Sequence, residues 1–215
     1  MSLPIHHTLS GPRPFPVQPL PGNAGLGLMR GRVHEACGPS RVTFAAFVLN
    51  QSQGKVIWIL PGWQSERLYP PGLHPYADAG RIIFARVRRP EDLLWSVEES
   101  LRSGAVPVVV AELLQPPGLT PIRRFHLAAE AGAEAARRWG RLPPLGLLLT
   151  PDKGGAQGVE SRWHMQPRPS KTTIYENHAA WEVTRLRARI EPLARWQVTR
   201  DPTGAINFTP DRGHD

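Results

Sequence analysis

The stretch RGRVHEACGPSRVTFAAF, residues 30–47, has the strand–turn–helix setting in which a phosphate-binding loop would sit. The loop pattern G-x-x-x-x-G-K-[ST] needs its late positions: glycine turns backbone amides onto the phosphates, lysine reaches the β- and γ-phosphates, and the hydroxyl holds Mg²⁺. Counted from Gly38, with Pro39 beside it, those positions hold Thr43, Phe44 and Ala45. We therefore expect a degenerate phosphate loop, with no nucleotide cofactor and no ATPase activity.

Metal chemistry has little support in the sequence. The eight histidines are scattered, and the pair His126 and Glu130, four residues apart on an expected helix, is explained by a solvated helix face. The single cysteine, Cys37, has no partner for an internal disulfide and suits a small buried position in a strand. We expect no metal site.

The positive charge is concentrated in one region of the chain. The protein carries 26 Lys and Arg against 18 Asp and Glu, and residues 161–200 hold five of the eight net positive charges. Such a concentration predicts a surface that faces a polyanion, with a solvated basic face as the alternative. Three arginines in this stretch alternate along an expected strand and should leave the sheet on one face. The residues proposed to contact DNA are Lys153, Gly154, Gly155, Arg162, Arg185, Arg187 and Arg189.

Elements of two kinds must position these residues. Apolar strands at 32–37, 55–60, 81–87, 106–113 and 145–150 are separated by helices expected at 41–51, from Pro90 to Gly104, and from an N-cap at Thr120 to about Trp139. This alternation predicts an α/β fold with a mostly parallel sheet flanked by helices. Strands at 159–165, 181–190 and 195–200 follow a glycine-rich loop without helices between them, which predicts an antiparallel extension.

Three regions are expected along the chain. Residues 1–29 are rich in proline and glycine and predict an extended or disordered arm. Residues 30–209 form one domain, and residues 210–215 form a tail. No apolar run approaches the roughly 20 residues that span a bilayer, and the N-terminus lacks a basic-then-apolar signal pattern. We therefore expect a cytoplasmic protein without a membrane partner.

The order of these elements, together with several short sequence motifs, resembles the RecA-like core. RGRVHEACGP looks like the segment that enters the recombinase phosphate loop, TPDKGGAQGVESRW lies where such proteins carry their second DNA-binding loop, and WQVTRDPTGAINF looks like their last strands. More narrowly, the run from Arg88 to Gly132 is similar to ImuA, the shortened RecA-like protein of bacterial mutagenesis cassettes. The resemblance covers about residues 28–209.

The resemblance implies a role in DNA-damage-induced translesion synthesis under the SOS response. ImuA-type proteins work with ImuB, a Y-family polymerase-like protein, and with a DnaE-type error-prone polymerase. Contact with a RecA filament or with single-stranded DNA is a further expectation. The catalytic glutamate of recombinases has no equivalent directly after the second strand, where Glu66 comes only beyond Trp63, and Ala111 with Glu112 beside it takes the place of the Mg²⁺-organising aspartate.

Three functions therefore stand open. The first is a non-catalytic adaptor of a translesion complex. The second is a SulA-type cell-division inhibitor that acts on FtsZ, and the third is an ATPase with an unorthodox loop. The loss of the phosphate loop, the metal acid and the catalytic acid together favours the adaptor.

Overall fold

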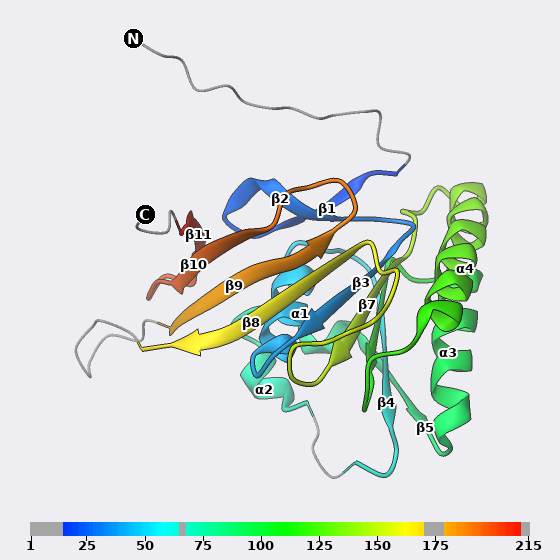
Figure 1. Cartoon of the computed structure of the whole chain (residues 1–215). Coiled ribbons are helices and arrows are strands. Elements are labelled where there is room, and N and C mark those ends of the chain that lie inside the picture. Colours follow the sequence, from blue (N-terminus) through cyan, green and yellow to red (C-terminus); the bar gives the residue numbers. More distant parts are fainter. Residues whose placement is uncertain (1–14, 65–67, 170–178, 212–215) are drawn as a thin grey trace.

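A nine-stranded sheet organises the computed structural model, which describes residues 15–64, 68–169 and 179–211 (Figure 1). The strand order is β11-β10-β9-β8-β3-β7-β6-β4-β5. The strands are β3 (Val33–Cys37), β4 (Val56–Pro61), β5 (Ile82–Val87), β6 (Val108–Glu112), β7 (Leu145–Thr150), β8 (Ser161–Arg168), β9 (Ala179–Ala188), β10 (Ala194–Arg200) and β11 (Ile206–Pro210). The mixed α/β class and the mostly parallel sheet are confirmed.

The parallel part runs from β8 through β3, β7, β6 and β4 to β5. The strands β3 and β7 are buried along their whole length, as continuous apolar strands covered on both faces must be. Helix α1 (Arg41–Asn50) packs on one face, and α3 (Pro90–Ser103) and α4 (Leu119–Arg138) pack on the other. The carboxyl ends of these strands lie at the bottom of Figure 1.

The antiparallel part consists of β8 to β11. Its inner face packs on α1 through alternate residues such as Met165, Val183 and Val198, which are buried. The residues between them are polar, and α3 and α4 do not extend over them in Figure 1. This alternation is the pattern of an antiparallel sheet with one solvated face, so the predicted antiparallel extension is confirmed.

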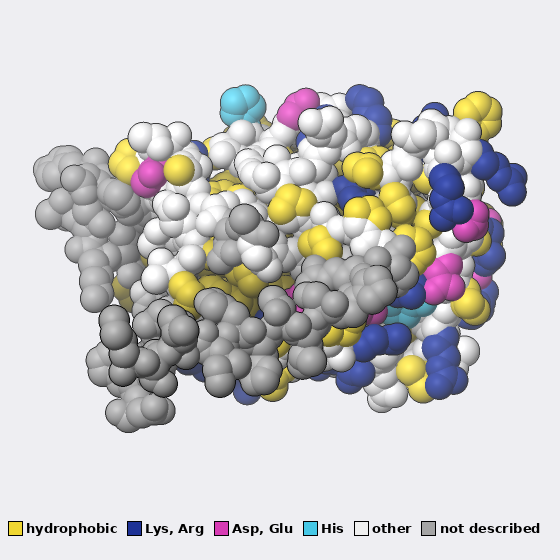
Figure 2. Space-filling view, turned by 90° about the horizontal axis from the view of Figure 1, so that it is seen from above, with side chains coloured by type: hydrophobic (Ala, Val, Ile, Leu, Met, Phe, Trp, Pro, Cys, Tyr) yellow, Lys and Arg dark blue, Asp and Glu magenta, His cyan; other side chains and the backbone are white. Residues whose placement is uncertain are grey.

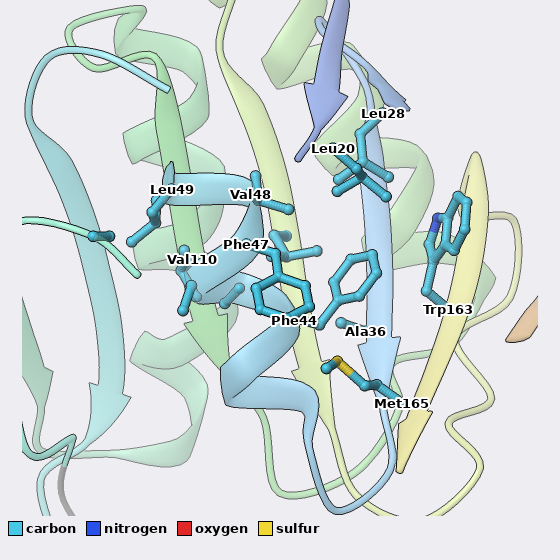
Figure 3. Packing of buried hydrophobic residues seen from close by; sticks show 14 of the residues in the cluster. Leu20, Leu28, Ala36, Phe44, Phe47, Val48, Leu49, Val110, Trp163 and Met165 are labelled. Carbon is cyan, nitrogen blue, oxygen red and sulfur yellow. The ribbon is translucent and has the colours of Figure 1, made fainter. Parts of the chain in front are cut away.

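The hydrophobic core is divided by the sheet into two clusters. The first surrounds α1, where Phe44, Phe47 and Val48 are buried and Phe44 points toward Trp163 of β8 (Figure 3). The second lies under α3 and α4 and includes Val97, Leu101 and other residues of those helices. Helix α1 has almost no polar face: its last six residues before Asn50 are all buried, because the sheet, the β1–β2 hairpin and α2 enclose it.

The prediction of an extended or disordered arm over residues 1–29 is partly wrong. Residues 17–29 form a hairpin of β1 (Val17–Leu20) and β2 (Asn23–Met29), whose Leu20 and Leu28 are buried in the first core cluster. A Pro-Gly pair fits the tight turn between two strands, and Gly22 there has a φ of 67°. This local signal outweighs the general tendency of a proline-rich segment to stay extended. Residues 1–14 of the expected arm and 212–215 of the expected tail lie outside the described residues.

Buried Arg30 anchors the hairpin to the parallel sheet. Its guanidinium donates to the carbonyl oxygens of Pro107 and Pro143, at 2.9 and 3.1 Å, and to the side chain of Gln18 in β1. Burial lowers the pKa of Arg30 to about 10. One cation therefore fastens strand β1 to the segments that precede β6 and β7, which lie 77 and 113 residues further along the chain than Arg30.

Two local expectations need correction. The N-cap of α4 is Gly118, and Thr120 lies inside the helix, because Gly118 already adopts extended dihedral angles and accepts the first helical hydrogen bond, from Ile122. The short helices α2 (Pro70–Leu73) and η1 (Ala79–Arg81) were not predicted. Both are too short to give a periodic hydrophobic pattern.

A buried histidine links the hairpin, β3 and β8. His34 Nε2 lies 2.9 Å from the carbonyl oxygen of Met29, and Nδ1 lies 2.7 Å from Ser161 Oγ, which also accepts from Trp163 Nε1 at 2.7 Å. With the proton on Nε2, every group in this chain has a donor and an acceptor while the imidazole is neutral. Burial lowers the pKa of His34 to about 4.

We expect the protein to lose stability as the pH falls from 6.5 toward 4. The unfolded chain takes up a proton on His34 first, since the folded pKa lies below the ordinary value, and this favours unfolding by about 3 kcal/mol at pH 4. Half-buried His126, whose pKa is also lowered to about 4 by desolvation, acts in the same direction. Urea denaturation at several pH values gives the free energy of unfolding as a function of pH. Between pH 6.5 and 4 this free energy should fall less steeply for His34→Gln than for the parent. It should fall as in the parent for the control His74→Gln, at an exposed site. An equal pH dependence of stability in His34→Gln and in the parent would show that His34 is not the group responsible.

Candidate functional site

The turn after β3, at the carboxyl end of the sheet, is packed against β8. Gly38 has a φ of 89°, and a Cβ atom there would lie 2.6 Å from the carbonyl oxygen of Met165 and 2.7 Å from His164 Nε2. The Ser40 amide donates to the same Met165 carbonyl oxygen at 3.0 Å. The backbone of β8 thus packs directly against this turn and already accepts a hydrogen bond from one of its amides.

The degenerate loop positions belong to the core. Phe44 is fully buried and its ring stacks on Trp163, with centroids 5.6 Å apart and planes at 29° (Figure 3). Ala45 is also fully buried, whereas Thr43 is half-buried. The residue in the lysine position therefore faces away from the turn and into the sheet, where an ammonium group would have no charged partner.

The carboxylate of Glu35 is the best-satisfied polar group at this end of the sheet. It is fully buried in β3 and accepts from Thr150 Oγ1 at 2.6 Å, and Arg162 Nε of β8 forms an ion pair with it. The amides of Gly155 and Ala156 also donate to it, at 2.9 and 3.1 Å. Because both oxygens have charged or backbone partners, the group is structural, with no lone pair directed at a ligand.

The glycine-rich loop after β7 is shaped by this carboxylate. Gly154 has a φ of 67°, and a Cβ atom there would lie 2.6 Å from Glu35 Oε1. Gly155 is one of the residues proposed to contact DNA, but its amide donates to Glu35 and so cannot donate to a phosphate. Glycine at position 154 is needed for close approach to Glu35, and Lys153 is exposed at the tip of the same loop.

The three alternating arginines do not share a face, and this prediction is wrong. A β-bulge shifts the register between β8 and β9, so that Trp163 pairs with Arg185 while the neighbouring Arg162 pairs with Arg187. Leu186 is the extra residue in the bulge. Paired residues point to the same side of a sheet and neighbours along a strand to opposite sides, so Arg185 and Arg187 lie on opposite faces.

Arg185 is buried in the first core cluster. Only 4% of it is exposed, and its guanidinium carbon lies 5.3 Å from the ring centroids of both Trp163 and Trp196. Its Nε donates to the carbonyl oxygen of Pro192 at 2.8 Å, and Glu191 forms an ion pair with it. A polyanion has no access to this cation. Trp163 is likewise a fully buried core residue.

Three of the proposed DNA contacts stay accessible. Lys153, Arg187 and Arg189 are exposed, although Arg189 Nε lies 3.6 Å from the buried carboxylate of Glu160. The largest gathering of basic side chains in Figure 2 lies to the right, over the position of α3 and α4 in Figure 1. The exposed arginines of α4 are Arg123, Arg124, Arg137 and Arg138. They gave little sequence signal because they form two separate pairs, with Glu130 and Glu134 between them.

The remaining candidate residues have structural partners. Glu112 accepts from Trp58 Nε1 at 2.6 Å, and Ala111 is fully buried. Cys37 is buried, as expected, and burial raises the pKa of its thiol to about 12. His126 Nε2 lies 3.1 Å from the carbonyl oxygen of Gly158. Glu66 lies outside the described residues.

Comparison of the sequence with models of known protein families and with characterised proteins gave no match. Among residues 15–64, 68–169 and 179–211, no group of three His, Cys, Asp or Glu side chains is placed to hold a metal ion. Within the same part of the chain, the helices are too short or too polar to cross a bilayer.

Glu35→Gln is expected to destabilise the protein by about 3–5 kcal/mol, since it leaves Arg162 without its buried partner and places an amide among donors. Glu99→Gln serves as the control, because Glu99 lies 3.3 Å from Arg102 at a half-exposed site and should cost less than about 1 kcal/mol. Chemical denaturation measures both. If Glu35→Gln lowers the free energy of unfolding no more than Glu99→Gln does, Glu35 does not have the proposed structural role.

Gly154→Ala should cost more than Gly140→Ala. Both glycines have positive φ, 67° and 63°, so both substitutions carry backbone strain of about 1–2 kcal/mol. Only at Gly154 does the new methyl group meet Glu35, which adds about 1–3 kcal/mol, whereas nothing lies within 4 Å at Gly140. Equal urea midpoints for the two variants would show that Glu35 does not constrain the loop.

Proposed function

We propose that this protein is a non-catalytic RecA-like accessory protein of error-prone translesion synthesis. In this role it works with an ImuB-like, Y-family polymerase-like protein, and indirectly with a DnaE-type polymerase, as an adaptor that joins them to damaged DNA or to a RecA filament. The observation that carries the proposal is the turn after β3. Its sequence resembles a recombinase nucleotide loop, but β8 packs directly against the turn, and the lysine position holds Phe44, which is buried in the core.

The arrangement of the elements supports a RecA-like core. The strand that carries the degenerate loop, β3, lies centrally in the sheet between β7 and β8. The glycine-rich loop follows β7, and the antiparallel strands come last, in the chain order that the resemblance implies. A fold alone does not specify a function, so the proposed role in mutagenesis rests on the similarity of the segment from Arg88 to Gly132 to ImuA.

The loss of nucleotide chemistry supports an adaptor over an enzyme. Catalysis of phosphoryl transfer needs charge at the phosphates and a bound metal ion. Here the lysine position is a buried phenylalanine, the amide of Ser40 is bonded to Met165, and Glu35 is fully occupied. A protein that keeps the fold without this chemistry must act through its surfaces.

Measurements of nucleotide binding, ATPase activity and partner binding test the proposal. Calorimetric titration with Mg²⁺-ATP should show no binding in the micromolar range, and Phe44→Lys should destabilise the core without creating an ATPase. Size-exclusion chromatography should show co-elution with an ImuB-like protein. Micromolar, Mg²⁺-dependent ATP affinity would favour the unorthodox ATPase, and inhibition of FtsZ GTPase activity by the added protein would favour the division inhibitor.

A further inference from the structure

The outer strand β5 exposes apolar side chains on both of its faces. Ile83 is 50% exposed and pairs with Ile57, whereas Phe84 is 40% exposed and pairs with Trp58 on the opposite face of the sheet. Among the described residues, β5 has β4 as its one strand neighbour, so its outer row of backbone groups is unpaired. An exposed sheet edge can pair with a further strand, and the charge of Arg86 in β5 favours a strand of complementary charge.

The opposite edge of the same sheet is protected. In β11, Ile206 and Phe208 are buried, while the exposed positions hold the polar residues Asn207 and Thr209. Pro210, which lacks an amide donor, ends the strand. The two edges of the sheet therefore differ: β5 exposes large apolar side chains, whereas β11 buries its own.

Exposed aromatic and basic side chains lie at the carboxyl end of β5. Gly62, Trp63, Arg86 and Arg88 line one open groove of about 500 Å³. Both arginines also line a second groove, of about 640 Å³, with Trp95. Trp63 and Trp95 are 44% and 60% exposed.

The two arginines of these grooves are available for a partner. Arg89 is held by a bidentate pair with Asp92, at 2.9 Å for both contacts. No ion pair joins Arg86 or Arg88 to any described residue. Tryptophan and arginine are the residues that most often dominate binding energy at protein interfaces.

We propose that the β5 edge binds an extended acidic segment of a partner protein, which adds a tenth strand to the sheet. A strand that runs along this edge pairs with the free backbone groups and covers Ile83 on one face and Phe84 on the other. Its acidic residues meet Arg86 and Arg88. This inference rests on the proposed adaptor function, for which it supplies a docking surface.

The observations favour this occupant over others. A nucleic acid strand stacking on Trp63 or Trp95 leaves the backbone edge and one face of β5 uncovered. A second copy of the chain brings the same arginines and a net charge of +8 to the contact. Residues 1–14 contain no acidic residue, so the N-terminal segment lacks the complementary charge.

Fluorescence anisotropy with synthetic peptides tests the proposal on the full chain. The probe has an apolar β-branched half and a glutamate-rich half, and its reversed sequence covers the other strand direction. We expect at least one of the two to bind, and lysine in place of glutamate, or N-methylation of alternate amides, to weaken binding at least tenfold. Arg86→Glu with Arg88→Glu should weaken it equally, whereas Asn207→Asp with Thr209→Asp at the β11 edge should leave it unchanged.

Several results would overturn the proposal: no binding of either peptide direction, equal binding of the N-methylated probe, or equal loss at the β11 edge. Oligothymidine binding lost in the arginine variant, without peptide binding, would reassign the grooves to nucleic acid. Dimerisation lost in Ile83→Asp with Phe84→Asp would reassign the edge to a second copy. Because no translesion protein is present, failure here is distinguishable from failure to co-elute with the ImuB-like protein.

Discussion

The buried carboxylate of Glu35 is the constraint on which the carboxyl end of the sheet depends. A carboxylate without water must be paired and hydrogen-bonded, and Glu35 obtains its partners from β7, from β8 and from the loop between them. The central strand thereby fixes the path of the chain from Thr150 to Arg162. This path places β8 beside β3, where the parallel part of the sheet changes into the antiparallel part.

The position of β8 in turn explains why the turn after β3 is closed. Met165 accepts from the Ser40 amide, and Trp163 provides the surface on which Phe44 stacks. At this turn, backbone and aromatic groups are used for packing. In our proposal, the same framework has exchanged a ligand site for a rigid core, and its contacts with other molecules lie on the outside of the sheet and on its edges.

The basic composition divides into structural and accessible charge. Arg30, Arg162 and Arg185 are enclosed by carbonyl oxygens, carboxylates or indole rings, and they hold distant segments together. Arg86, Arg88 and the exposed arginines of α4 face solvent. Net charge and its distribution along the sequence do not separate the two groups, because burial of an arginine depends on partners that come from elsewhere in the chain.

The sequence by itself determined most of the fold. Apolar runs with β-branched residues specify buried strands, and the apolar periodicity of α3 and α4 specifies helices, because these patterns reflect local geometry. It also determined that Phe44 and Cys37 suit a core, since their chemistry fits no phosphate or disulfide.

Only the tertiary structure decided the fate of the site residues. The bulge at Leu186 turns Arg185 into the core, and no pattern within β9 reveals it, because a bulge is defined by the pairing of two strands. The role of Gly154 depends on Glu35, more than a hundred residues away. The exposure of Ile83 and Phe84 follows from the place of β5 at the end of the strand order, and strand order is set by long-range contacts rather than by local sequence.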